Sequence, residues 1–557
     1  MKKMKAVLCA INSKYIHTNL AVRYIKAYAD KYCENAECII LEDTINSDIN
    51  ETLRAIIEIN ADVAAFSCYI WNIDRVICIC RLLKEKNPDI TVILGGPEVS
   101  FNAHEYLKSI ADYIVCGDGE KSVTALINAL SKCEEIPHGL GICYRKNAEY
   151  LISESYCEKN LFEIESPYTD EYLSVVRERI AYIESTRGCP FSCAFCLSGS
   201  DKGVRFFDED YVKNAILRLW NSGAKTTKFI DRTFNSKRSH ADMIIGFILE
   251  NYSHMPKMCF HFEIAADILA ESTLDLLKSA PKGLFQVEAG LQSFNHHTLE
   301  AVSRKTDTDK ICENVKKLVS FGNIHTHIDL IAGLPYEDFA SFRESFNKAY
   351  SVGAHMLQLG FLKLLHGSKL RDEAEKHGFV YSDKAPYEIV STAWIDAEDM
   401  DKLRQVEDAN EKIANSGRFR RALDYVLSVT KMTPFDLFLG FGKKESMALD
   451  DYTALVFEYF ASIDGVDKAV LRDKMCCDRL ATNKSGKLPK CLQILDKMLA
   501  KVTYLLENNP GTASIKGVKR GVCILYSENK AVYADYVENS DEYELNYVGI
   551  DELTEVC

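Results

Sequence analysis

The first 130 residues alternate short apolar runs with amphipathic stretches, a pattern that predicts a parallel sheet wrapped by helices. The apolar runs that predict strands are residues 6–10, 38–41, 63–67, 91–94 and 113–116. Five such strands indicate an α/β domain of the flavodoxin-like (Rossmann-like) type over residues 1–150. Ligands of such domains bind beyond the carboxyl ends of the strands.

A second series of six strand–helix units follows between residues 175 and 375. The predicted strands are residues 180–184, 227–231, 259–263, 285–288, 326–331 and 356–359. Each of them ends in polar residues that can face a common mouth.

The last third of the chain has a different pattern. Apolar residues at helical spacing predict a mostly helical region over residues 380–505, and residues 521–526 and 531–534 alternate like the strands of a small β hairpin. The sequence therefore predicts three domains, over residues 1–150, 175–375 and 376–557. No residue of the third domain points to a particular chemistry.

Composition narrows the class of protein. Of 557 residues, 47% are hydrophobic and 27% are charged, as in ordinary globular proteins. No run of eighteen apolar residues is present, so a membrane-spanning helix is excluded, and the basic start lacks the cleavage site of a signal peptide. We therefore expect a cytoplasmic protein with no membrane partner. The net charge of -14 gives no electrostatic footprint for nucleic acid and disfavours it as a partner.

Twenty cysteines in a chain without an export signal do not indicate a disulfide framework. Several of them, such as Cys68, Cys80 and Cys116, fall in apolar segments, where reduced cysteine packs as a small hydrophobic residue. So many thiols fit a reducing, anaerobic cell.

Three other cysteines form a compact cluster. Cys189, Cys193 and Cys196 have the spacing C-x3-C-x2-C on the loop after the apolar segment 180–183. Three thiolates can hold three irons of a [4Fe-4S] cluster and leave the fourth iron open for another ligand. Zinc is the alternative, but a structural zinc site needs four closed ligands, and no second C-x2-C pair is present.

The cysteine spacing, with Phe195 before the third cysteine, resembles the signature of the radical SAM enzymes, in which the open iron chelates S-adenosylmethionine (SAM). The six strand–helix units fit the partial (β/α)6 barrel of that family. The resemblance implies that SAM-binding residues lie near the barrel mouth: Phe195, Asp231, Glu263, Glu288, Gln292 and Arg304. The alternative for Glu263 and Glu288 is an ion pair with lysines outside the barrel.

The first domain also carries a family signal. Its polar residues fall at the carboxyl ends of the predicted strands and converge on one crevice. Placed ahead of a radical SAM cluster, they resemble the cobalamin-binding domains of one radical SAM subgroup, although Gly95 and Gly96 could also form a simple tight turn. The predicted cobalamin-binding residues are His17, Asn19, Ser67, Tyr69, Trp71, Asn72, Gly95, Gly96, Pro97, Glu98, Gly117, Gly119 and Glu120.

The surroundings of His17 depart from the D-x-H-x-x-G pattern in which a histidine ligates cobalt. Tyr15 stands two residues before His17, and Leu20 stands three residues after it. His17 could coordinate cobalt, donate a hydrogen bond to a corrin side chain or cap the following helix, and the sequence favours the last two roles.

The resemblance implies an enzyme in which an electron from flavodoxin or ferredoxin leads to cleavage of SAM into a 5'-deoxyadenosyl radical, followed by C-methylation of an unactivated carbon from methylcobalamin. No catalytic residue beyond the cluster is predicted. The alternatives are a cobalamin-assisted rearrangement or cyclisation and a non-catalytic cobalamin and iron–sulfur sensor. Residues 376–557 resemble the C-terminal domain of unknown function in a branch of this family, which would close the barrel mouth or shape the substrate pocket.

Overall fold

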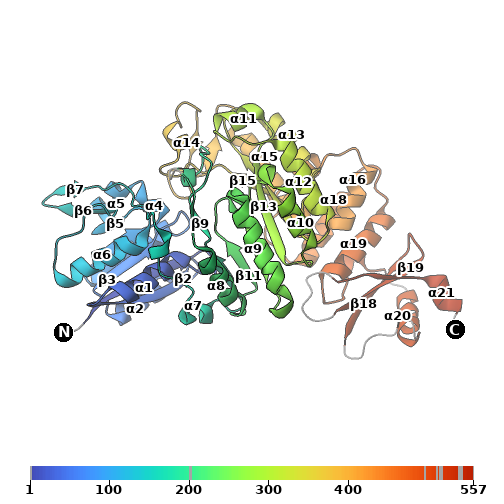
Figure 1. The fold of residues 1–557 in the computed structure, drawn as a ribbon. Helices are drawn as coiled ribbons and strands as arrows, with labels where there is room; N and C mark the ends of the chain where they lie inside the picture. Colours follow the sequence, from blue (N-terminus) through green and yellow to red (C-terminus); the bar gives the residue numbers. More distant parts are fainter. Residues whose placement is uncertain are drawn as a thin grey trace. The chain divides into compact units, whose positions relative to one another are not determined.

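Figure 1 shows the computed structural model of the chain, which describes residues 3–199, 203–494, 497–509, 512, 518–536 and 543–555. The chain divides into two compact units, each described by itself. The first unit comprises residues 1–342, 352–355 and 359–396, and the second comprises residues 343–351, 356–358 and 397–557. The described helices include none with both the length and the apolar character needed to cross a bilayer.

The first sheet has seven strands in the order β2-β1-β3-β4-β5-β6-β7. The strands are β1 (Met4–Asn12), β2 (Ala36–Thr44), β3 (Val63–Ser67), β4 (Thr91–Gly95), β5 (Tyr113–Val115), β6 (Ile142–Lys146) and β7 (Glu149–Leu151). Strands β1 to β5 pair in parallel and are the five predicted ones. The sequence missed the antiparallel strands β6 and β7, because exposed charged residues weaken their apolar pattern.

Helices cover both faces of this sheet. Alternate residues of β1 point to opposite faces: Leu8 packs with α1 and α6, whereas Cys9 packs with α2 and α3. A strand buried on both faces needs apolar residues throughout, which explains the continuous apolar run in β1. The helices are α1 (Leu20–Tyr32), α2 (Ile49–Ile59), α3 (Ile73–Lys86), α4 (Pro97–Ser100), α5 (Ala103–Ser109) and α6 (Gly119–Lys132).

The second sheet has six strands in the order β15-β14-β13-β12-β11-β8, so all six predicted strands are present. They are β8 (Ile180–Ile183), β11 (Thr226–Phe229), β12 (Cys259–Ile264), β13 (Phe285–Gln292), β14 (His325–Ala332) and β15 (Met356–Phe361). Neighbouring strands from β8 to β14 pair in parallel. Short β9 (Thr186–Arg187) and β10 (Arg205–Phe206) form an antiparallel pair around the cysteine loop.

Helices connect successive strands of the second sheet, as the predicted partial barrel requires. Figure 1 shows α8 and α9 beside β11, and α10 and α12 beside β13. The helices are α7 (Asp170–Val175), α8 (Glu209–Trp220), α9 (Arg238–Asn251), α10 (Glu271–Ser279), α11 (His296–Ala301), α12 (Thr308–Ser320), α13 (Phe339–Tyr350) and α14 (Lys369–Asp372).

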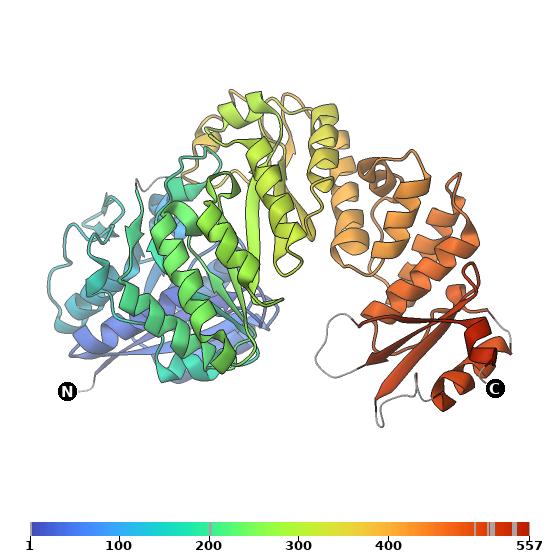
Figure 2. The ribbon, with the colours of Figure 1, turned by 45° about the vertical axis from the view of Figure 1, so that its right-hand side comes forward.

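The second unit is mostly helical, in agreement with the sequence (Figure 2). Its helices are α15 (Ala397–Ala409), α16 (Arg420–Val429), α17 (Pro434–Phe441), α18 (Leu449–Ser462), α19 (Lys468–Thr482), α20 (Met498–Asn508) and α21 (Ile550–Glu555). The predicted hairpin is β18 (Lys519–Leu525) with β19 (Lys530–Tyr536), to which β20 (Asn546–Gly549) adds a strand that the sequence did not reveal. The predicted fold class is therefore confirmed.

Candidate cofactor-binding site

The three motif cysteines line one side of a cavity of about 180 Å³ at the carboxyl ends of the barrel strands. Cys193 is buried, Cys189 is half-buried and Cys196 is exposed. Burial raises the pKa of the Cys193 thiol, and the Arg304 guanidinium, whose Nη1 lies 3.6 Å from Cys193 Sγ, opposes this increase. In the described part of the chain, no three His, Cys, Asp or Glu side chains are close enough together to hold a single metal ion.

The backbone at the start of the cysteine loop requires glycine. Gly188 has a φ of +91°, and a Cβ there would lie 2.3 Å from the carbonyl oxygen of Gly203. The two ends of the loop are therefore in backbone contact, which only a residue without a side chain permits.

Five of the six predicted SAM-binding residues line the same cavity. They are Phe195, Glu263, Glu288, Gln292 and Arg304. Within the described residues, Gln292 Oε1 and Arg304 Nε are buried without a hydrogen-bond partner. Because unpaired buried polar atoms are costly, these atoms fit a polar ligand such as SAM in this cavity.

The structure does not place Asp231 in this cavity. Its fully buried carboxylate accepts hydrogen bonds from the hydroxyl groups of Ser185, at 2.8 Å, and Thr186, at 2.5 Å. Burial raises the pKa of Asp231 to about 6. Asp231 therefore fixes the turn between β8 and β9, and its oxygens are already engaged.

Lys228, on the inner face of the barrel sheet, joins two of the predicted carboxylates. Its Nζ lies 3.7 Å from Glu263 Oε1 and 3.5 Å from Glu288 Oε2. Burial opposes ionisation of Glu288, but His261, 3.0 Å away, and the charge on Lys228 outweigh it and lower the pKa of Glu288. The ion pairs considered in the sequence analysis therefore exist, but they face the barrel interior.

The strand register extends this polar surface into rows across the barrel. One row runs through Tyr182, Lys228, His261, Gln286 and His325. The next row places Glu263 beside Glu288 and His327. Barrel interiors are normally filled by branched apolar side chains, so this interior is suited to polar groups.

Asp329 and Arg232 also line the cysteine cavity and were not predicted. Asp329 follows His327 by two residues on β14 and so lies on the same face of that strand. Burial and the neighbouring Glu288 and Glu263 raise the pKa of Asp329. The alternation of polar and apolar residues along β13 and β14 was the signal that could have revealed this face.

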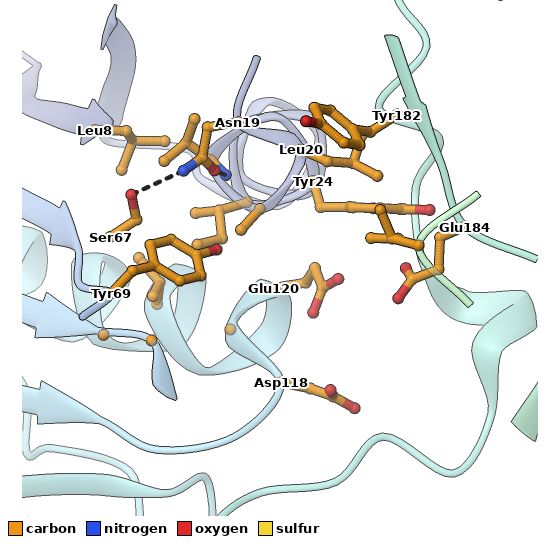
Figure 3. Close-up of a pocket in the computed structure, with 18 of the residues that line it drawn as sticks. Leu8, Asn19, Leu20, Tyr24, Ser67, Tyr69, Asp118, Glu120, Tyr182 and Glu184 are labelled. Carbon is orange, nitrogen blue, oxygen red and sulfur yellow. Dashed lines mark hydrogen bonds between the residues drawn. The ribbon is translucent and has the colours of Figure 1, made fainter. Parts of the chain in front are cut away.

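A larger cavity, of about 570 Å³, lies at the carboxyl ends of β1, β3, β4 and β5 and includes residues of the barrel strands (Figure 3). Ten of the thirteen predicted cobalamin-binding residues line it: His17, Asn19, Ser67, Tyr69, Trp71, Gly95, Gly96, Gly117, Gly119 and Glu120. Asn19 donates a hydrogen bond of 3.0 Å to Ser67, marked by the dashed line in Figure 3. Amide, hydroxyl and glycine backbone groups of this kind suit the many side-chain amides of a corrin.

Two glycines of this cavity occupy backbone conformations that other residues rarely adopt. Gly96 has a φ of +109°, and its Cβ would lie 2.5 Å from the carbonyl oxygen of Cys68. Gly117 has a φ of +92°, and a Cβ there would lie 2.0 Å from the carbonyl oxygen of Tyr156. Both turns therefore depend on glycine and keep the cavity floor free of side chains.

Three predicted residues do not line this cavity. Asn72 is buried and donates to the carbonyl oxygens of Ile11 and Ser67, so it fixes the loop after β3. The buried Glu98 accepts a hydrogen bond from the Tyr387 hydroxyl, and Pro97 is the first residue of α4. The side chains of Asn72 and Glu98 therefore use their polar groups in contacts within the protein.

His17 lies at the junction of the first sheet and the barrel. Its Nδ1 is 2.6 Å from the hydroxyl oxygen of Tyr182 on β8. Burial and the charge on Lys14 lower the pKa of His17 and favour a neutral imidazole. The helix-capping role is wrong, because the side chain of Asn19 accepts from the Val22 amide and caps α1.

The two cavities share residues. Arg232, after β11, and Glu263, on β12, line both the cysteine cavity and the larger cavity. A group held above the first sheet and a group held at the cysteine loop would therefore meet at the barrel mouth.

Comparison with known families agrees with this arrangement. Residues 7–127 match the B12 binding domain, residues 183–349 match the radical SAM superfamily, and residues 375–520 match a protein family of unknown function, DUF4080. The chain therefore carries a B12-binding domain, a radical SAM domain and a DUF4080 domain, in that order. The predicted resemblance to cobalamin-binding radical SAM proteins with a C-terminal domain of unknown function is confirmed by these three matches.

Curated relatives are similar to about half of the chain. The chain is 26% identical over 358 residues to the cobalamin-dependent radical SAM methyltransferase TokK of Streptomyces tokunonensis. This alignment covers 56% of the present chain and 49% of TokK. It is 29% identical over 330 residues to the 2-(S-pantetheinyl)-carbapenam-3-carboxylate methyltransferase of Streptantibioticus cattleyicolor, which is 53% of this chain and 45% of that protein. The chain thus spans about half the length of these relatives.

Solved structures show the same fold. The structure of the cobalamin-dependent SAM radical enzyme OxsB with aqua-cobalamin and SAM bound superposes with a TM-score of 0.61 at 15% identity. The superposition covers 93% of this chain and 82% of the OxsB chain. The methyltransferase TsrM of Kitasatospora setae has a TM-score of 0.57 at 16% identity and covers 68% of this chain and 77% of its own.

Proposed function

We propose that this protein is a cobalamin-dependent radical SAM enzyme that methylates an unactivated carbon of its substrate. The observation that supports this most directly is the common wall of the two cavities, formed by Arg232 and Glu263. When bound, the cluster with SAM supplies a 5'-deoxyadenosyl radical and cobalamin supplies the methyl group. The barrel mouth is then the place where the substrate carbon reacts.

The residues of the chain have distinct tasks in this proposal. Cys189, Cys193 and Cys196 hold the cluster, and the unpaired atoms of Gln292 and Arg304 bind the polar groups of SAM. The glycine turns at Gly96 and Gly117 support the corrin. Cys196 is exposed, so an external donor such as flavodoxin or ferredoxin can approach the loop.

Product analysis tests the proposal. Anaerobically reconstituted protein, given SAM, a reductant and substrate, should form S-adenosylhomocysteine and 5'-deoxyadenosine in parallel with the methylated product. Cys196→Ala should abolish formation of 5'-deoxyadenosine because the cluster is lost. A product formed without S-adenosylhomocysteine would instead support a rearrangement or cyclisation. Protein that binds SAM and never forms 5'-deoxyadenosine would support a sensor.

A further inference from the structure

A pair of arginines lies at the base of the cysteine loop. Strands β9 and β10 close this loop, and their antiparallel register places Arg187 opposite Arg205. Arg187 precedes Gly188 and Cys189 directly. Any movement of either arginine therefore shifts one end of the segment that carries the three thiols.

Both arginines bind carboxylates of the first domain. Arg187 Nη2 lies 2.5 Å from Glu120 Oε1, and Arg187 Nη1 lies 3.5 Å from Asp118 Oδ1. Arg205 Nη1 lies 2.6 Å from Asp118 Oδ2. Asp118 and Glu120 flank Gly119 at the start of α6, and all three residues line the larger cavity.

This ion cluster is shielded from water. The side chain of Arg187 is 10% exposed, and that of Glu120 is 5% exposed. The Arg187 guanidinium also lies over the rings of Tyr24, at 5.1 Å, and Phe207, at 5.6 Å. In Figure 3 the carboxylates of Glu120 and Glu184 turn toward the same space, and Arg187 contacts both.

The middle of the cysteine loop, at the residue after Cys193, has its own anchors. The Ala194 amide donates to the carbonyl oxygen of Val302 at 2.8 Å, and the Ala194 carbonyl accepts from the Leu370 amide at 2.9 Å. The loop is thus anchored at its middle and at its base, and the ion cluster at the base links it to the start of α6.

We propose that Arg187 and Arg205 are positioning residues that couple the two cofactor sites, so that assembly of the cluster strengthens cobalamin binding and cobalamin binding stabilises the cluster. This inference rests on the proposed function. Cluster assembly fixes the backbone beside Arg187, which then holds Asp118 and Glu120 in the arrangement that forms the cavity wall. Coupling between two binding sites is reciprocal and typically changes affinity five- to 150-fold.

The test is a titration with hydroxocobalamin, followed by absorbance, of full-length protein with and without its reconstituted cluster. The wild-type protein should bind hydroxocobalamin about tenfold more tightly when the cluster is present. In Arg187→Gln this ratio should fall close to one, and Arg187→Lys should restore part of it because the charge remains while the paired contacts are lost. The reverse measurement is the rate at which a chelator removes the cluster. Cobalamin should slow this rate in the wild-type protein and not in Arg187→Gln.

Arg218→Gln is the matched control, since Arg218 forms an exposed ion pair with Asp170 away from both cavities, and it should keep the wild-type ratio. If Arg187→Gln does not fold, Arg205→Gln carries the test through the contact with Asp118. A wild-type ratio of one, or an unchanged ratio in folded arginine variants, overturns the coupling while leaving the proposed function intact. Wild-type protein that binds no cobalamin, or assembles no cluster, overturns both.

Discussion

The first sheet and the barrel sheet use their polar residues differently. In the first sheet, β1 is buried on both faces from Ala6 to Asn12, and most of the polar residues that line the larger cavity lie in loops beyond the strand ends. In the barrel sheet, β13 alternates buried and half-buried residues along its whole length. The first sheet therefore lines its cavity with the loops at the carboxyl ends of its strands, whereas the barrel sheet lines its cavity with side chains of its inner face.

This difference determines which substitutions each site tolerates. The cavity of the first sheet depends on the backbone of these loops, so substitution of the glycines in their turns should disturb it most. An inner face depends on balanced side-chain charges, so removal of one charge affects its neighbours. Substitutions at the loops of the first sheet and at the inner face of the barrel should therefore have different effects.

The largest effect is expected on cobalamin affinity, at the glycine turn after β5. Gly117→Ala places a Cβ 2.0 Å from the carbonyl oxygen of Tyr156 and should lower cobalamin affinity more than tenfold, measured by absorbance titration. Gly139→Ala is the control, because Gly139 also has a positive φ, of +75°, but has no atom within 4 Å of the added Cβ. Equal cobalamin affinity in the two variants would show that the turn at Gly117 does not shape the site.

At the inner face, a histidine should make stability depend on pH. Burial, with a smaller contribution from His325, lowers the pKa of His327 from 6.5 to about 4. The unfolded chain then binds more protons than the folded one in this range, so stability should fall by about 2–3 kcal/mol as the pH drops from 6.5 to 4. Thermal unfolding of wild-type and His327→Gln protein across this range should show a shallower dependence in the variant. Identical slopes would contradict this role of His327.

Removal of the barrel cation should have a smaller effect. Lys228→Met leaves Glu263 and Glu288 without their shared partner and should destabilise the protein by about 1–2 kcal/mol, since all three groups are partly exposed. Lys225→Met, which removes an exposed ion pair with Glu178, should change stability by less than about 0.5 kcal/mol. Urea unfolding measures both variants. A near-neutral Lys228→Met would mean that the inner carboxylates do not need this charge.

The smallest effect is expected at Ser67. Ser67→Ala removes the acceptor of the Asn19 hydrogen bond, worth about 1 kcal/mol, and should weaken cobalamin binding about fivefold without affecting the cluster. Ser109→Ala, which removes an exposed local hydrogen bond in α5, should leave cobalamin affinity unchanged. A cobalamin affinity that Ser67→Ala leaves untouched would place the Asn19 contact outside the binding site.

Local patterns predicted most of the fold and of the candidate site. The parallel strands, the cysteine loop and the glycine turns all depend on residues close together in the chain. The sequence could not reveal that Asp231 lies outside the cysteine cavity, because its partners, Ser185 and Thr186, stand about 45 residues earlier. Nor could it reveal that Glu98 lies outside the larger cavity, because its partner, Tyr387, stands 289 residues later.

Residues on the inner face of the barrel were harder to predict. Lys228 and Asp329 lie within strands, and the direction of a strand side chain depends on the register of its neighbours. A short apolar run reveals that a strand exists but does not reveal which of its faces meets a cavity. Period-two alternation in β13 was the available signal, and it becomes informative only when the neighbouring strands are known.

Electron paramagnetic resonance of the anaerobically reconstituted, reduced protein, before and after addition of SAM and with metal analysis of the same sample, tests directly whether the three cysteines hold a cluster with an open iron. The account predicts about four irons per chain and a change of the cluster signal when SAM binds the open iron, with both lost in Cys196→Ala. Zinc in place of iron, or a cluster signal that does not respond to SAM, would contradict it.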